Sequence, residues 1–147
     1  MDSPLIDGVY LTPLKIIKTN GGSVLHAMKN IDRGFEGFQE AYFSSIDSGT
    51  IRAWKKHNEM TLNLIVPIGE IKFVLLDQRN NIDSINFHEI ILSRKNYYRL
   101  TVPPKIWVGF QGLSKKENIL LNLSNLKHNQ DESDQKDINE FEYDWSI

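Results

Sequence analysis

The sequence predicts an all-β domain, and three observations lead to this prediction. Short segments rich in β-branched and aromatic residues recur at fairly even spacing along the 147 residues. Clusters of Gly, Asn, Asp and Pro separate these segments, as expected of turns. No segment longer than a turn or two has helical periodicity. Many short strands joined by frequent turns are typical of a β-sandwich or a small β-barrel.

The N-terminal part of the chain contains four expected strands. The first is an alternating segment that ends at Asn20–Gly22, a strong turn signal. A charged loop with two glycines follows over residues 29–37, and Asp47-Ser48-Gly49 separates the last two strands. The four strands are expected over residues 9–19, 23–28, 38–46 and 50–54.

The most hydrophobic hairpin lies in the middle of the chain. Residues 60–77 are expected to form two strands about a turn at Pro67–Gly69, with Ile71, Phe73 and Leu75 on one face and Val74 within the second strand. A polar connection over residues 78–86 follows. The later strands are expected over residues 87–93, 97–102, 105–113 and 118–126.

The composition of the chain changes at its C-terminal end. Residues 127–147 are polar and acidic and then contain Phe141, Tyr143, Trp145 and Ile147. We expect one domain over residues 1–126, followed by a solvated linker that ends in an aromatic anchor.

The bulk composition excludes several classes of protein. The formal net charge is −2, without a large basic field, so a nucleic-acid partner is not expected. There is no cysteine, which excludes disulfides and thiolate metal sites. The N-terminus lacks the features of a signal peptide, and no apolar run is long enough to span a membrane. We therefore expect a soluble cytoplasmic protein.

The best candidates for chemistry precede the hydrophobic hairpin. His57 follows three cations, which favour a neutral imidazole and hence a general base; the alternative is a solvated histidine at a charged strand end. Lys55 and Lys56 point to opposite faces of a strand, so at most one joins His57. Arg33 and Arg52 are suited to binding phosphate. No metal-ligand spacing and no phosphate-binding glycine loop is visible, so neither a metal nor another cofactor is expected.

Five segments between Asp32 and Asn129 resemble, in their order, the dTDP-4-dehydrorhamnose 3,5-epimerases and their relatives. These segments are DRGFEGFQEAYFS, GTIRAWKKH, GEIKFVLLDQR, VPPKIWVGFQGLS and ILLNLSNLKHN. The resemblance implies a cupin-type antiparallel jelly-roll β-barrel, a nucleotide-diphosphate 4-keto sugar as substrate, and a homodimer.

The resemblance also implies roles for individual residues. Arg33 and Arg52 correspond to diphosphate contacts, and Glu40 to the glutamate after the RGxF motif of the family. His57 corresponds to the catalytic base, although two additional residues separate it from Arg52. The carboxylate that orients the base in the family has no assigned counterpart in this sequence.

Other positions depart from the family pattern. The lysine on the strand after the base is replaced at Leu62 or Asn63, so that Lys55 or Lys56 is the candidate substitute. Two late tyrosines are replaced by Asn122 and His128, which makes His128 the candidate proton donor and adds Asn63 and Asn122 to the candidate substrate contacts. A cupin metal-histidine position is Val108, in line with the expectation of no metal.

The resemblance implies an epimerase that inverts C3, C5 or both by proton abstraction, in the synthesis of a surface polysaccharide sugar such as that of lipopolysaccharide. One alternative is a 3,4-ketoisomerase, although the histidine pair typical of those enzymes is absent from WKKHNE. A second alternative is a non-catalytic cupin that binds a sugar nucleotide.

Overall fold

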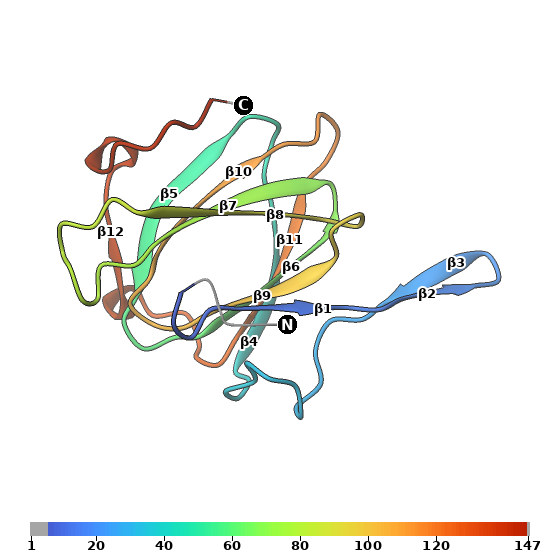
Figure 1. The fold of residues 1–147 in the computed structure, drawn as a ribbon. Helices are drawn as coiled ribbons and strands as arrows, with labels where there is room; N and C mark the ends of the chain where they lie inside the picture. Colours follow the sequence, from blue (N-terminus) through green and yellow to red (C-terminus); the bar gives the residue numbers. More distant parts are fainter. Residues whose placement is uncertain (1–5, 147) are drawn as a thin grey trace.

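The expected strands form two five-stranded antiparallel sheets in the computed structural model, which describes residues 6–146 (Figure 1). The order is β1-β9-β6-β11-β4 in the first sheet and β12-β5-β10-β7-β8 in the second, while β2 and β3 form a separate hairpin. The elements are β1 (Tyr10–Pro13), β2 (Ile16–Thr19), β3 (Gly22–Leu25), β4 (Glu40–Ser45), β5 (Ile51–His57), β6 (Leu62–Ile68), β7 (Glu70–Leu76), β8 (Phe87–Ser93), β9 (Tyr98–Val102), β10 (Trp107–Gly112), β11 (Ile119–Ser124), the 3-10 helix η1 (Gln130–Glu132), β12 (Ser133–Gln135) and the 3-10 helix η2 (Ile138–Glu140).

The two sheets pack face to face over the main hydrophobic core. Ile71, Phe73 and Leu75 on β7 point into it, as the alternation of the sequence predicts, and Val74 and Leu76 point to the opposite face. The β6–β7 turn requires Gly69, because its φ is 82° and a Cβ atom there would overlap the carbonyl oxygen of Glu117. The predicted all-β class is confirmed, and the only helices in residues 6–146 are two single 3-10 turns.

The C-terminal residues belong to the domain, which corrects the expectation of a solvated linker. Ser133–Gln135 pairs with β5 as an edge strand of the second sheet. Phe141, Tyr143 and Trp145 pack on the outer face of this sheet, in a second cluster around Trp54 and Trp107. Ile147, the last residue of the expected aromatic anchor, lies outside the described residues.

The single strand expected over residues 9–19 is interrupted at Leu14 and Lys15. Pro13 ends β1, since proline has no N–H to continue the ladder. The chain then leaves the sheet as the β2–β3 hairpin, which extends away from the barrel (Figure 1). This hairpin exposes Ile16, Ile17 and Val24.

Candidate active site

A β-bulge in β5 determines which of its side chains face the space between the sheets. Phe110 pairs with Arg52 and Val108 pairs with Lys55, so that two residues of β5 stand opposite Gly109 alone. Arg52 and His57 are five positions apart, and a regular strand would direct them to opposite faces. The extra residue reverses this alternation after Arg52. Arg52, Lys55 and His57 therefore share the inner face.

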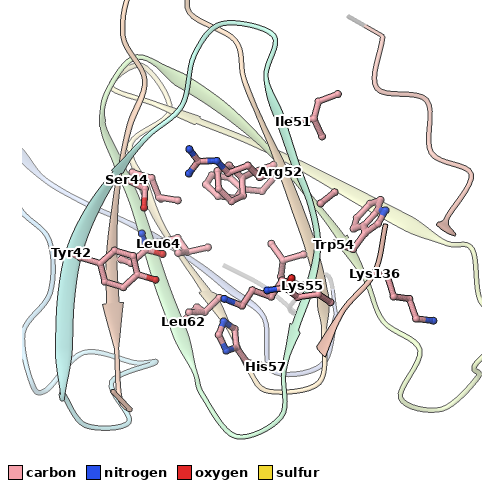
Figure 2. Close-up of a pocket in the computed structure, with 17 residues that line it drawn as sticks. Tyr42, Ser44, Ile51, Arg52, Trp54, Lys55, His57, Leu62, Leu64 and Lys136 are labelled. Carbon is pink, nitrogen blue, oxygen red and sulfur yellow. The ribbon is translucent and has the colours of Figure 1, made fainter. Parts of the chain in front are cut away.

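These three side chains line a cavity of about 470 Å³ between the two sheets. Figure 2 shows them on the β5 wall, with Tyr42 and Ser44 of β4 on the opposite wall. Asn122 of β11 also lines the cavity and is the direct cross-strand partner of Tyr42. The floor is apolar and is formed by Leu62, Leu64, Phe73, Val108, Phe110 and Leu120. A molecule bound in this cavity would thus contact polar and charged side chains on its walls and apolar side chains on its floor.

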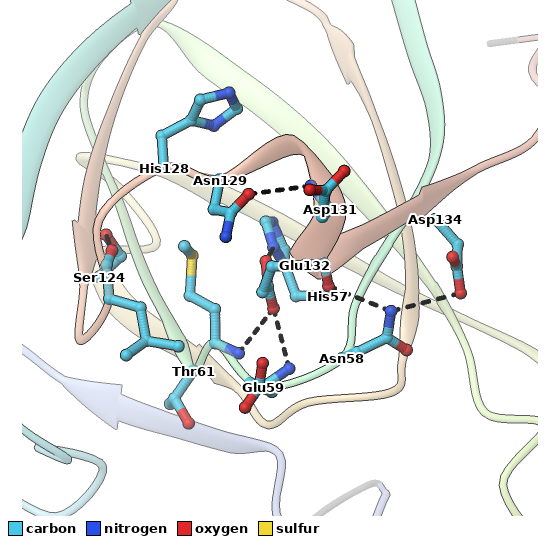
Figure 3. A network of polar contacts seen from close by, with 12 residues as sticks. His57, Asn58, Glu59, Thr61, Ser124, His128, Asn129, Asp131, Glu132 and Asp134 are labelled. Atoms are coloured by element: carbon cyan, nitrogen blue, oxygen red, sulfur yellow. Dashed lines mark hydrogen bonds and ion pairs between the residues drawn. The ribbon is translucent and has the colours of Figure 1, made fainter.

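His57 forms a close pair with a carboxylate from the C-terminal segment. Its Nδ1 lies 2.6 Å from Oε1 of Glu132, and the Glu132 side chain is only 4% exposed (Figure 3). The other oxygen of Glu132 accepts the backbone N–H groups of Glu59 and Met60, each at 2.8 Å. Because an ionised carboxylate only accepts hydrogen bonds, Nδ1 of His57 carries the proton. Nε2 then has a free lone pair, as a general base requires.

The surroundings of Glu132 keep its carboxyl group ionised. Burial alone would raise the pKa of Glu132. The hydrogen bond from His57 and those from the two backbone N–H groups outweigh burial, so that the pKa of Glu132 lies below its usual value. A permanent negative charge beside Nδ1 also stabilises the imidazolium that forms when His57 accepts a proton.

Tyr42 places a phenol on the wall opposite His57. Burial, together with the negative charge of Glu40, raises the pKa of Tyr42. Its phenol is therefore protonated at neutral pH and able to donate a proton.

The structure brings together four of the residues singled out from the sequence. His57, Arg52, Lys55 and Asn122 all line the same cavity. Of the two candidate lysines, Lys55 is thus the one that shares the cavity with His57.

Lys56 and Asn63 are corrections to the expected substrate contacts, because both point away from this cavity. Lys56 lies on the outer face of β5, 5.0 Å from the centre of the Trp107 ring and 3.6 Å from Asp134. Asn63 lies on the outer face of β6, where it accepts from the Thr101 hydroxyl at 2.6 Å and donates to the carbonyl of Gly34 at 3.0 Å. Successive residues of a strand point to opposite faces of the sheet, which explains why Lys56 and Asn63 both point away from the cavity.

Three further candidates do not line the cavity of this chain. Arg33 is exposed, with its guanidinium 4.2 Å from the centre of the Tyr10 ring. Glu40 begins the edge strand β4, and its carboxylate accepts the backbone N–H of His128 at 3.0 Å. The His128 side chain is exposed. The structure thus does not bring the expected proton donor together with His57.

Two residues of the site were not recognised from the sequence. Glu132 is separated from His57 by 75 residues and lies in an acidic segment, where no local pattern distinguishes it from its neighbours. Tyr42 lies on the edge strand β4. Its only relation to the family pattern is its pairing with Asn122, which occupies a position where the family has a tyrosine. Within residues 6–146, no group of three or more His, Cys, Asp or Glu side chains is arranged to hold a metal ion. The same residues include no helix long and apolar enough to cross a membrane.

The chain is similar to a solved dTDP sugar isomerase from Desulfovibrio desulfuricans G20. The two share 32% identity with a TM-score of 0.89, and the match covers 95% of this chain and 92% of the other. This chain belongs to the dTDP-sugar isomerase family. The resemblance read from the five sequence segments is thereby confirmed, and with it the prediction of an isomerase-type enzyme.

Two solved structures with lower sequence identity share the fold. A dTDP-4-dehydrorhamnose 3,5-epimerase from Elizabethkingia anophelis NUHP1 has 17% identity and a TM-score of 0.77, over all of this chain and 85% of that one. A sugar 3,4-ketoisomerase from Thermoanaerobacterium thermosaccharolyticum, solved with TDP, has 19% identity and a TM-score of 0.75, over 90% of each chain. The cupin jelly roll is thus confirmed. No protein-family model matches the chain. No curated protein sequence matches it either.

Proposed function

We propose that this isomerase-family protein epimerises a nucleotide-linked 4-keto-deoxysugar at C3, C5 or both. The observation that carries the proposal is the His57–Glu132 pair beside the cavity, at 2.6 Å, with Nε2 of His57 left free to accept a proton. The 4-keto group acidifies the hydrogens on the neighbouring sugar carbons, so one well-positioned base is sufficient to start the reaction.

In the first step, Nε2 of His57 removes the proton from the carbon beside the ketone. The electrons of the broken C–H bond form a C=C bond, and the carbonyl electrons move to oxygen to give an enolate. His57 becomes an imidazolium, which the buried Glu132 carboxylate stabilises. The ammonium group of Lys55, on the same inner face, supplies positive charge for the enolate oxygen.

In the second step, a proton returns from the opposite side of the sugar and inverts the carbon. We propose Tyr42 as the donor, because its phenol lines the wall that faces His57. The enolate collapses to the ketone as the new C–H bond forms; solvent then reprotonates the phenolate, and the His57 imidazolium releases its proton to solvent. Tyr42 replaces His128 in this role, because His128 is not among the side chains that line the cavity.

Arg52 is proposed as the diphosphate ligand of the site. It is the most exposed of the three cationic or basic side chains on the β5 wall, and its guanidinium can bind phosphate oxygens in pairs. The substrate would then lie with its diphosphate near Arg52 and its sugar ring near Lys55 and His57.

The proposal includes a homodimer. The β2–β3 hairpin contacts few other residues, and an isolated two-stranded hairpin is marginal in water. Its exposed Ile16, Ile17 and Val24 favour a protein surface as their partner. The unpaired edge strand β4 exposes Phe43, which is 69% accessible, and offers such a surface on a second copy. We further propose that the enzyme works in the cytoplasm, in the synthesis of a sugar for a surface polysaccharide such as lipopolysaccharide.

The test is to incubate the protein with a panel of dTDP-linked 4-keto sugars in deuterated water and to follow C3 and C5 by NMR. Deuterium incorporation with inversion is the expected result. His57→Asn should keep the fold and lower the exchange rate by about a hundredfold to ten-thousandfold. A product with the ketone moved to C3 would indicate a ketoisomerase instead. Binding of the sugar nucleotide without any exchange would indicate a non-catalytic cupin.

A further inference from the structure

The C-terminal segment after β12, residues 136–146, crosses the outer face of the second sheet, and we call it the strap (Figure 1). Its three aromatic side chains surround Trp54 of β5. The ring centres of Phe141, Tyr143 and Trp145 lie 5.4, 6.4 and 5.5 Å from that of Trp54. Trp54 borders the cavity on β5 beside Lys55 and His57, but its ring packs in the aromatic cluster on the outer face of the sheet, so the aromatic side chains of the strap pack behind the wall of the cavity (Figure 2).

The backbone of the strap begins at the bulge of β5. Trp54 and Lys136 exchange both backbone hydrogen bonds, at 2.9 and 3.0 Å. The indole N–H of Trp54 donates to the carbonyl of Ile138 at 3.3 Å. Trp54 is one of the two residues that form the bulge opposite Gly109. The strap thus holds the part of β5 that aligns Arg52, Lys55 and His57.

The strap is also fixed to the strands beyond β5. A Cβ atom on Gly109 would lie 3.0 Å from the Trp145 ring, so the absence of a side chain at this position of β10 admits the indole. Nζ of the buried Lys72 on β7 lies 5.3 Å from the centre of the Tyr143 ring and 5.5 Å from that of Trp145. The Tyr143 hydroxyl donates to Glu89 on β8. The strap is therefore anchored across four strands of the sheet.

Glu132 lies immediately before the strand that this anchoring supports. Strand β12 has three residues and is an edge strand that pairs only with β5, with Ser133 opposite His57. So short an edge strand contributes little stability by itself. The aromatic packing of the strap, on the C-terminal side of β12, supplies the buried apolar area that holds it in register.

We propose that the strap is a positioning element: its docking behind β5 holds Glu132 against His57 and so keeps the base in its reactive tautomer. This inference rests on the proposed function for its consequence in catalysis, but the effect on His57 is independent of the substrate. Phe141, Tyr143 and Trp145 are positioning residues, since they act through Trp54 and β12 and not on the sugar.

A double-mutant cycle tests the proposal, using Trp145→Ala, Glu132→Gln and the combined variant in the full-length protein. If the strap acts through Glu132, Trp145→Ala should lower kcat roughly tenfold in the wild-type background and have little effect in the Glu132→Gln background, as expected of coupled residues. The affinity for free dTDP should not change. Equal losses in both backgrounds would overturn the proposal.

A second measurement needs no turnover. The 15N NMR shifts of the His57 ring distinguish the Nδ1–H from the Nε2–H tautomer. Trp145→Ala should move the population away from Nδ1–H, as Glu132→Gln should. Leu92→Ala, a core change on β8, serves as a control that lowers the melting temperature without affecting the tautomer. An unchanged tautomer in Trp145→Ala would overturn the proposal, even if the protein proves to have no epimerase activity. If Trp145→Ala does not fold, the same tautomer measurement is made on Phe141→Leu, with the same expected result.

Discussion

At the scale of single residues, Glu132 links stability to pH. Its pKa in the folded protein is below its usual value, so the carboxylate stabilises the fold above the unfolded pKa, and this contribution is lost as the pH falls through the folded pKa. Glu132→Gln should lower the free energy of unfolding by about 1–3 kcal/mol at neutral pH, because the backbone N–H groups of Glu59 and Met60 and the His57 ring lose a charged acceptor. Denaturation from about pH 7 to pH 3 should show the difference shrinking below about pH 4.5. A difference that is constant with pH would contradict the assignment.

Arg52 supports a second prediction at this scale. Replacing it with alanine should weaken binding of free dTDP by about 1.5–3 kcal/mol, the range for a lost hydrogen bond to a charged group. Arg94→Ala is the matched control, since Arg94 is exposed and bonds the Pro67 carbonyl away from the cavity. Calorimetric titration with dTDP measures both variants. Equal affinities for wild type and Arg52→Ala would remove Arg52 from the diphosphate site.

At the scale of elements, the bulge in β5 depends on the missing side chain of Gly109. In Gly109→Ala the new Cβ would lie 2.8 Å from Cβ of Ala53 and 3.0 Å from the Trp145 ring. We expect a loss of about 1–3 kcal/mol in the free energy of unfolding from this overpacking, together with a lower kcat. Gly22→Ala in the hairpin is the control, because its Cβ would meet only Thr19, at 3.9 Å. Thermal unfolding of the two variants should differ clearly, and similar midpoints would show that β5 tolerates a shift at the bulge.

At the scale of the whole molecule, the proposed homodimer depends on the β2–β3 hairpin. Val24→Lys places a charge on an apolar side chain that is 49% exposed in the single chain, and it should shift the protein from dimer to monomer at micromolar concentration. Ile82→Lys is the control, since this residue is 79% exposed in the β7–β8 connection at the other end of the molecule (Figure 1). Light scattering after size-exclusion chromatography reports the mass. A monomeric wild type would contradict the dimer.

The sequence by itself determined the strands, the main hairpin and the candidate base. Alternating apolar residues have the period of a strand, and glycine turns separate them, so the all-β class and the inward-facing Ile71, Phe73 and Leu75 follow from local chemistry. His57 was identifiable because a cationic approach to an apolar hairpin is unusual and because its neighbours resemble a known motif.

Only the tertiary structure decided which residues join His57. The bulge opposite Gly109 reverses the alternation of β5, so Lys55 and not Lys56 shares the inner face with the base. Glu132 reaches His57 through the pairing of β12 with β5, and Tyr42 reaches the opposite wall as the cross-strand partner of Asn122. These contacts join residues far apart in the sequence. Their positions depend on strand register and on packing of the strap, which no local pattern of residues encodes.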